Sequence, residues 1–217
     1  MDSAGDRALL HRAVRSFCAA ALCLCSAPLA HAAAPPAGSM WLEEIGLERF
    51  SQRRGAPRIG RSIRDQPIRL GGVEYPHGIG TRSISEFVID LKGNAARFTS
   101  TVGIDDEIRG NVGSVVFEVW ADDTRVAASG LMRPGDAPKV LSADLRGARI
   151  LTLLVDDGGD TSNDDEVAWA GAMIELLRPD GERPAAYVPP AEELLRIAAP
   201  STSPRPAIPR NLSRLNS

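Results

Sequence analysis

The sequence is poor in cysteine, histidine and aromatic residues, and the positions of the few it has are informative. Its 217 residues include three cysteines, three histidines and 5% aromatic residues. All three cysteines and two of the histidines lie among the first 31 residues. That stretch begins with Arg7, Arg12 and Arg15, continues as an uncharged apolar run, and ends in Ala30-His31-Ala32. This pattern is typical of a secretory signal peptide.

The apolar run is shorter than the ~20 residues that a membrane-spanning helix needs. We therefore expect residues 1–34 to be a signal peptide that is cleaved near Ala32. The mature protein is then expected to be secreted or periplasmic, without attachment to a membrane. Tail residues 179–217 hold eight of the 16 prolines, so we expect an extended linker or tail there. A tail of this kind is typical of the front part of a longer protein.

Loss of the signal peptide leaves no cysteine and only one histidine, His77. This excludes a thiol nucleophile, a thiolate metal site and a multi-histidine zinc site. A Ser-His-Asp arrangement would have to use His77. With no disulfide, the hydrophobic core must stabilise the exported fold by itself. The net charge of −3 shows no basic excess, so we expect no nucleic-acid partner, and we expect a monomer.

The folded part is predicted to span residues 40–178 and to consist mainly of β-strands. Several short runs alternate apolar and polar residues or are rich in β-branched and aromatic residues, which favours strands. These runs are Glu86–Leu91, Arg97–Val102, Ser114–Trp120, Ile150–Val155 and Gly171–Leu177. Glycine- and aspartate-rich turns separate them. Short strands at this spacing predict an all-β, antiparallel β-sandwich of jelly-roll type.

Three segments of the chain carry most of the polar residues that could serve a function. They are Gly71–Ser83, Val102–Glu107 and Val155–Ala170. In this order and spacing, together with the opening Trp41-Leu42, they resemble the NPCBM family, which is related to family 51 carbohydrate-binding modules. The similarity extends from Trp41 to about Leu177. It implies a β-sandwich that binds sugars without catalysis, usually attached to a glycoside hydrolase such as an α-galactosidase.

Two positions depart from the family pattern. The family usually has histidine where this chain has Arg82, in Gly-Thr-Arg82-Ser, and again where it has Glu166, in Asp-Glu166-Val-Ala-Trp. The two histidines are thus replaced, in separate segments, by side chains of opposite charge. We hypothesise that Arg82 and Glu166 lie close together and form an ion pair.

The resemblance and the residue chemistry together suggest a sugar-binding site on loops at one end of the sandwich. Carboxylates accept hydrogen bonds from sugar hydroxyls, arginine donates them, and aromatic rings can stack on sugars. The candidate residues are Tyr75, His77, Arg82, Asp105, Asp106, Glu107, Glu166 and Trp169. The alternative for Asp105–Glu107 is a strand-end turn whose carboxylates bind main-chain amides. Trp169 and Tyr75 could equally pack inside the protein, and Trp41 is expected in the core.

The segment from Asp156 to Glu166 contains six carboxylates in eleven residues. Hard oxygen ligands on a tight loop are those that Ca²⁺ prefers, although the spacing is not that of an EF-hand. A structural calcium ion is therefore one interpretation, with these candidate ligands: Asp156, Asp157, Asp160, Asp164 and Asp165. The other interpretation is a solvated turn whose side chains cap backbone amides.

Two functions remain as alternatives to sugar binding. A sandwich that has lost both family histidines could serve as a structural or protein-interaction domain. A pair of carboxylates is also the minimum for glycoside hydrolysis. A small sandwich, however, offers little depth for the water-excluding cleft that a glycosidase needs.

Overall fold

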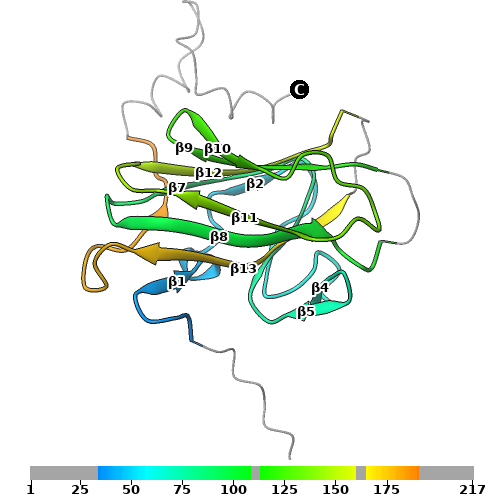
Figure 1. Cartoon of the computed structure of the whole chain (residues 1–217). Coiled ribbons are helices and arrows are strands. Elements are labelled where there is room, and N and C mark those ends of the chain that lie inside the picture. Colours follow the sequence, from blue (N-terminus) through cyan, green and yellow to red (C-terminus); the bar gives the residue numbers. More distant parts are fainter. Residues whose placement is uncertain (1–33, 109–112, 160–164, 191–217) are drawn as a thin grey trace, which may run out of the picture. The chain divides into compact units, whose positions relative to one another are not determined.

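The computed structural model describes residues 34–108, 113–159 and 165–190, and these form two antiparallel β-sheets packed face to face (Figure 1). Each sheet has six strands. Sheet A contains, in spatial order, β11 (Lys139–Asp144), β8 (Ala95–Ile104), β13 (Glu166–Leu176), β6 (Gly78–Arg82) and β3 (Arg58–Ile59), with β1 (Ser39–Trp41) also paired to β13. The predicted antiparallel β-sandwich is confirmed.

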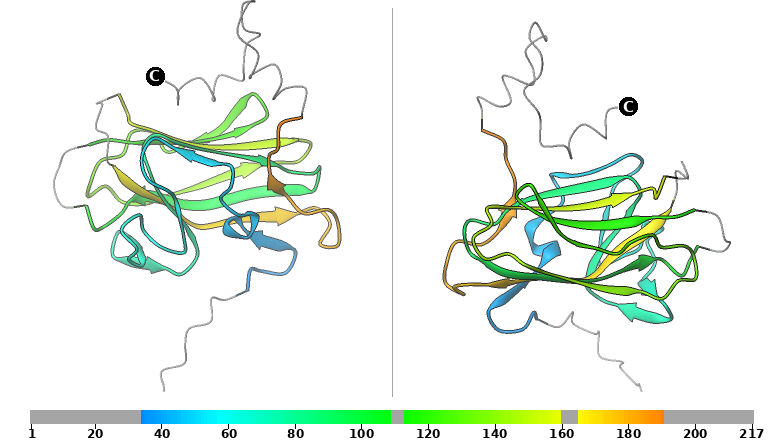
Figure 2. Two further views of the ribbon diagram at one scale, coloured as in Figure 1. Left: turned by 180° about the vertical axis from the view of Figure 1, so that it is seen from behind. Right: turned by 45° about the horizontal axis from the view of Figure 1, so that its top comes forward.

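Sheet B forms the second layer (Figure 2). It contains β10 (Thr124–Ala128), β9 (Val116–Ala121), β12 (Ile150–Asp156), β7 (Ser85–Asp90) and β14 (Ala185–Ala186), with β2 (Phe50–Gln52) also paired to β7. A short 3₁₀ helix, η1 (Leu42–Ile45), follows β1, and a separate hairpin is made by β4 (Ile68–Leu70) and β5 (Val73–Tyr75). Within the described ranges, no helix has the length and apolarity to cross a membrane.

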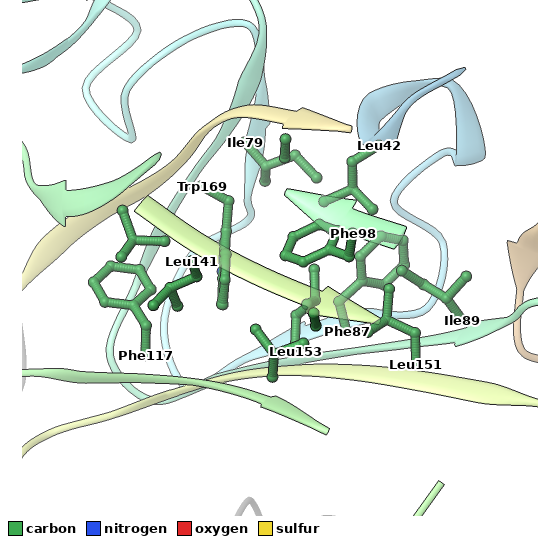
Figure 3. Close-up of a cluster of buried hydrophobic side chains, with 14 of the residues drawn as sticks. Leu42, Ile79, Phe87, Ile89, Phe98, Phe117, Leu141, Leu151, Leu153 and Trp169 are labelled. Carbon is green, nitrogen blue, oxygen red and sulfur yellow. The ribbon is translucent and has the colours of Figure 1, made fainter. Parts of the chain in front are cut away.

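The core lies between the sheets and is built from the alternating apolar residues of their strands. Phe87 and Ile89 of β7 and Leu151 and Leu153 of β12 point inward from sheet B, and Phe98 of β8 faces them from sheet A (Figure 3). Each of these side chains is almost completely buried. Alternation of this kind is what a strand with one buried face requires, which explains why the sequence reveals these strands.

Trp169 occupies the centre of this core (Figure 3). Its ring meets Phe117 edge-on, with ring centroids 5.0 Å apart, and meets Phe98 at 6.0 Å. Phe117 belongs to sheet B and Phe98 to sheet A, so the indole joins the two layers. Edge-to-face contacts between aromatic rings add to the stabilisation that burial provides.

Two segments expected as loops are strands in the structure. Gly78–Arg82 forms β6, and Glu166–Ala170 forms the first half of β13, with Arg82 paired to Glu166 and Ala170 to Gly78. The glycines of β6 allow neighbouring backbone to approach. A β-carbon on Gly78 would collide with the carbonyl oxygen of Trp169, and one on Gly80 would collide with that of Arg61. Glycine inside a strand often marks such a close approach.

The folded part also extends beyond the predicted boundary at residue 178. β14 pairs with β7, and the amide of Tyr187 donates a hydrogen bond to the carbonyl of Val88. The side-chain amide of Asn94 donates to the carbonyls of Arg178 and Glu182, which attaches the intervening turn to the domain. The start of the predicted linker therefore belongs to the sandwich.

The β4–β5 hairpin covers part of the outer face of sheet A. Ile68 and Leu70 of the hairpin are completely buried against Ala168 and Ala170 of β13. The small side chains of Ala168 and Ala170 allow the hairpin to pack closely on sheet A. The hairpin therefore divides the outer face of sheet A into two areas.

Candidate functional site

Part of each of the three polar segments that the sequence singles out lies at one end of sheet A. β13 lies between β6 and β8, so Glu166 is paired with Arg82 on one side while Val167 is paired with Ile104 on the other. The amide of Asp105 then donates a 3.0 Å hydrogen bond to the carbonyl of Glu166. Residues from three distant parts of the chain are thus neighbours.

Arg82 and Glu166 form the hypothesised ion pair. Nη2 of Arg82 lies 3.0 Å from Oε1 of Glu166, and the two side chains are 25% and 4% exposed. The two residues share the outward-facing side of neighbouring strands, because the buried Thr81 and Val167 beside them face inward. The double departure from the family pattern therefore produces a direct contact.

A second guanidinium, that of Arg64, which the sequence did not indicate, also contacts Glu166. Nε of Arg64 donates a 2.6 Å hydrogen bond to Oε2 of Glu166, and this bond raises the pKa of Arg64. Arg64 lies in the loop between β3 and β4, 102 residues away in sequence. Nothing in the local sequence distinguishes it from the other surface arginines, so no pattern could have found it.

Glu107 lies close to Arg64 and is more accessible than Glu166. Its Oε1 accepts a 2.5 Å hydrogen bond from the hydroxyl of Ser62, and its Oε2 lies 3.9 Å from Nε of Arg64. The Glu107 side chain is 20% exposed and Arg64 is largely exposed. We refer to Arg64, Arg82, Glu107 and Glu166 as the guanidinium–carboxylate cluster. It presents hydrogen-bond donors and acceptors side by side in a fixed arrangement.

Asp105 and Asp106 both accept hydrogen bonds from main-chain amides, although Asp105 is buried and Asp106 is exposed. Asp105 is 2% exposed and accepts hydrogen bonds from the amides of Arg69 and Glu107. Burial raises the pKa of Asp105 to about 6. Asp106 accepts hydrogen bonds from the amides of Gly71 and Gly72, at 2.9 and 2.7 Å, which anchors the turn of the β4–β5 hairpin.

Asp105 is buried, so its carboxylate is not accessible to a sugar at the surface. Asp106 is exposed, and its role as a sugar-binding acceptor stays a prediction. Trp169 was also expected at the site, but none of its surface is exposed, so it cannot stack on a ligand. It lies on β13 where both faces of sheet A are covered, and its ring fills the core.

Tyr75 and His77 lie at the opposite end of β6 from Arg82, and His77 lies beside Trp41. The Trp41 and His77 rings are stacked, with centroids 4.1 Å apart and an angle of 10°. Nδ1 of His77 lies 2.8 Å from a carboxylate oxygen of Glu43. Tyr75 is half-buried beside Gly171. The single site predicted from sequence is thus two separate groups, because β6 is extended.

Only part of the acidic segment falls in the described ranges. Asp160 and Asp164 lie outside them. Asp156 accepts a hydrogen bond from the amide of Asp157, and Asp157 accepts one from the amide of Gly159. Asp165 is buried. Among the described residues, no three histidine, cysteine or acidic side chains are grouped so that they could hold a metal ion. Calcium binding stays a prediction.

The chain matches a known protein family. Residues 38–175 match the family described as NPCBM/NEW2 domain. Alpha-1,3-galactosidase B of Akkermansia muciniphila is 33% identical over 126 residues, which cover 54% of this chain and 16% of that protein. The matched stretch is a small part of the curated relatives, 7% of the length of one and 16% of the other.

Solved structures show the same fold. The CBM51 module of Clostridium perfringens GH95, in complex with methyl-galactose, is 33% identical with a TM-score of 0.59, covering 63% of this chain and 99% of that one. The structure of CBM51-2, in complex with GlcNAc, and INT domains from Clostridium perfringens ZmpB is 30% identical, also with a TM-score of 0.59. It covers 64% of this chain and 32% of that one.

Proposed function

The chain belongs to the NPCBM/NEW2 domain family, and from this premise we propose that its guanidinium–carboxylate cluster binds a galactose-type sugar. The domain is a non-catalytic carbohydrate-binding module of the CBM51 type, found as part of glycoside hydrolases. The position of the site on the domain and the identity of the sugar are the parts that we propose.

The observation that carries the proposal is the arrangement around Glu166. Its two oxygens accept hydrogen bonds from Arg64 and Arg82, which fixes both guanidinium groups, and the Arg64 side chain is 56% exposed. Glu107 stands beside them as a partly exposed acceptor. Neighbouring hydroxyls of a sugar ring each donate and accept hydrogen bonds, and paired charged donors and acceptors bind them strongly. A preorganised group of this kind loses little conformational entropy on binding.

Galactose is proposed because of the sugars and substrates that appear in the names of similar proteins. One relative is an alpha-1,3-galactosidase, and one structural neighbour holds methyl-galactose. Another neighbour holds GlcNAc, so that sugar is the natural comparison. The family histidines are replaced by Arg82 and Glu166 here, which supports a contact pattern particular to this chain.

Three further properties belong to the same proposal. The signal-peptide pattern supports a secreted or periplasmic protein. The proline-rich tail and the names of the curated relatives support association with a glycoside hydrolase of the α-galactosidase kind. We also propose that the domain acts as a monomer, since one sandwich contributes every residue of the cluster.

Calorimetric titration with methyl-galactoside and with GlcNAc tests the proposal. We expect methyl-galactoside to bind, and we expect Arg82→Ala and Arg64→Ala each to weaken its binding by about tenfold or more, since each removes a charged donor. Arg125→Ala is the matched control, because Arg125 makes an equally short ion pair with Glu118 on sheet B. A domain that binds neither sugar would instead support the structural or protein-interaction function.

A further inference from the structure

The side chains at the centre of the outer face of sheet B are buried. Thr152 and Leu154 alternate with the core residues of β12, so they point to the outer side. Glu86 of β7 is paired with Leu154 and points the same way. The exposed fractions of Thr152, Leu154 and Glu86 are 4%, 3% and 1%. An antiparallel sheet with one free face leaves such side chains in contact with water, so this face is covered.

The described residues do not account for this cover. Leu154 is buried, yet it belongs to neither hydrophobic cluster that the described residues form. Among the described strands and the helix η1, β12 makes its close contacts with β7 and β9, its two neighbours in the sheet (Figure 1). A further segment of the chain is needed to bury the outward side chains of β12.

The described part of the chain ends beside this face. β14 pairs with the second half of β7, and Tyr187 extends the pairing to Val88 through its amide. Alternation places Tyr187 on the same side of the sheet as Val88, which is the outer side. β2 occupies the rest of this edge of β7, beginning at Phe87. Pro189 and Pro190 have no amide hydrogen to donate, so the chain leaves the sheet there.

The sequence that follows, residues 191–199, has the pattern of a short amphipathic helix. Pro190 precedes it and Pro200 follows it, which is typical of the two ends of a helix. Glu192 and Arg196 are four residues apart and share the polar side. The apolar residues recur at the spacing of one helix face. They are Ala191, Leu194, Leu195 and Ala198.

The dimensions and chemistry of this segment fit the covered face. Nine helical residues extend about 13 Å at ~1.5 Å per residue, and three adjacent strands, β7, β12 and β9, span about 10 Å at ~4.8 Å per step. We propose that residues 191–199 form a helix that docks on the outer face of sheet B, with Leu194 and Leu195 against Thr152 and Leu154. The other long segment outside the described ranges, residues 1–33, precedes β1 of sheet A.

Docking of this helix fixes where the proline-rich tail begins relative to the sugar site. The guanidinium–carboxylate cluster lies on the outer side of sheet A, whereas the helix lies on the outer side of sheet B. The helix therefore leaves the cluster open and directs the tail away from it. This inference does not depend on the sugar-binding proposal, because it uses none of the residues of the cluster.

Hydrogen–deuterium exchange of the full chain, followed by mass spectrometry, tests the docking. An isolated helix of nine residues is only marginally stable in water, so slow exchange of amides 194–199 requires packing on the domain. We expect these amides to exchange at least about tenfold more slowly than those of residues 211–216 in the same tail. Leu195→Glu should remove the protection without affecting the sandwich, and Thr152→Glu should remove it from the other side of the contact. Leu212→Glu is the matched control and should leave it unchanged.

Each outcome of this experiment decides the proposal. Equal exchange of the two tail segments in the wild type would overturn it. Protection that Leu195→Glu removes but Thr152→Glu leaves intact would show that the segment packs elsewhere, which also overturns it. Protection that disappears on dilution, together with a dimer in sedimentation, would assign the helix to the sheet of a second copy and reject docking within one chain.

Discussion

Glu86 offers the most quantitative test of the structure, because its carboxylate is buried without compensation. It lies on β7, paired with Leu154 of β12, and is 1% exposed. Neither carboxylate oxygen accepts a hydrogen bond within the described part of the chain. Removing a charge from water without pairing it is unfavourable. Burial accordingly raises the pKa of Glu86 from 4.5 to about 7.

The shift makes stability depend on pH in a definite direction. Between the unfolded value of 4.5 and the folded value of about 7, the folded state holds a proton that the unfolded state has lost. Stability must therefore fall as the pH rises through this range and level off above it. At about 1.4 kcal/mol per pKa unit, the rise from 4.5 to about 7 gives a full effect of at most about 3.5 kcal/mol.

The Glu86→Gln variant carries a neutral side chain of the same shape at every pH. We expect it to equal the wild type at pH 4 and to be more stable by up to about 3.5 kcal/mol at pH 8. Urea unfolding at several pH values, followed by tryptophan fluorescence, measures the difference. The stability of the variant still falls with rising pH up to about pH 6, but less steeply than that of the wild type, because burial also raises the pKa of Asp105.

The exposed Glu74, which pairs with Arg69, provides the matched control as Glu74→Gln. This change should leave the pH profile of stability as it is in the wild type. Equal stability of Glu86→Gln and the wild type at pH 8 would refute the reasoning, since it would mean that the Glu86 carboxylate is solvated or paired in solution.

Three further predictions concern the core, the site and the metal. Trp169→Ala should destabilise the domain by about 3–5 kcal/mol in thermal or urea unfolding, because it empties the centre of the core; a loss below about 1 kcal/mol would contradict the packing. Gly80→Ala should weaken methyl-galactoside binding in calorimetry, because its β-carbon displaces the backbone at Arg61, three residues before Arg64. The loss of affinity should exceed what the accompanying fall in melting temperature explains. Unchanged binding would show that this loop is not part of the site. If the acidic segment binds calcium, EDTA should lower the melting temperature and added Ca²⁺ should restore it, whereas no response to either would favour a solvated turn.

Much of the fold could be predicted because its central strands have one buried and one open face. The alternation of Phe87 and Ile89 with polar neighbours reflects this directly. The first half of β13 has no such pattern, since Ala168 and Ala170 are buried under the hairpin while Trp169 is buried in the core. A strand covered on both sides loses its period-two signal. For that reason Trp169 was wrongly expected at the site.

The candidate site could be predicted only where pairing of strands brings residues together. Arg82 and Glu166 occupy paired positions of β6 and β13, and their opposite charges in the sequence indicated the contact. Arg64 reaches the same carboxylate from a loop, and its position depends on the path of the chain over Gly80. Tyr75 and His77 were grouped with Arg82 because all three were expected on loops at one end of the sandwich, whereas the extended strand β6 separates them.

The most direct test of sugar binding by the cluster is a crystal structure of this domain soaked with methyl-galactoside. Our account predicts the sugar ring at the Glu166 end of β13, with hydroxyls within hydrogen-bond distance of Glu107 and of at least one guanidinium, Arg64 or Arg82. A galactoside bound elsewhere on the sandwich, with the cluster left open to solvent, would contradict it.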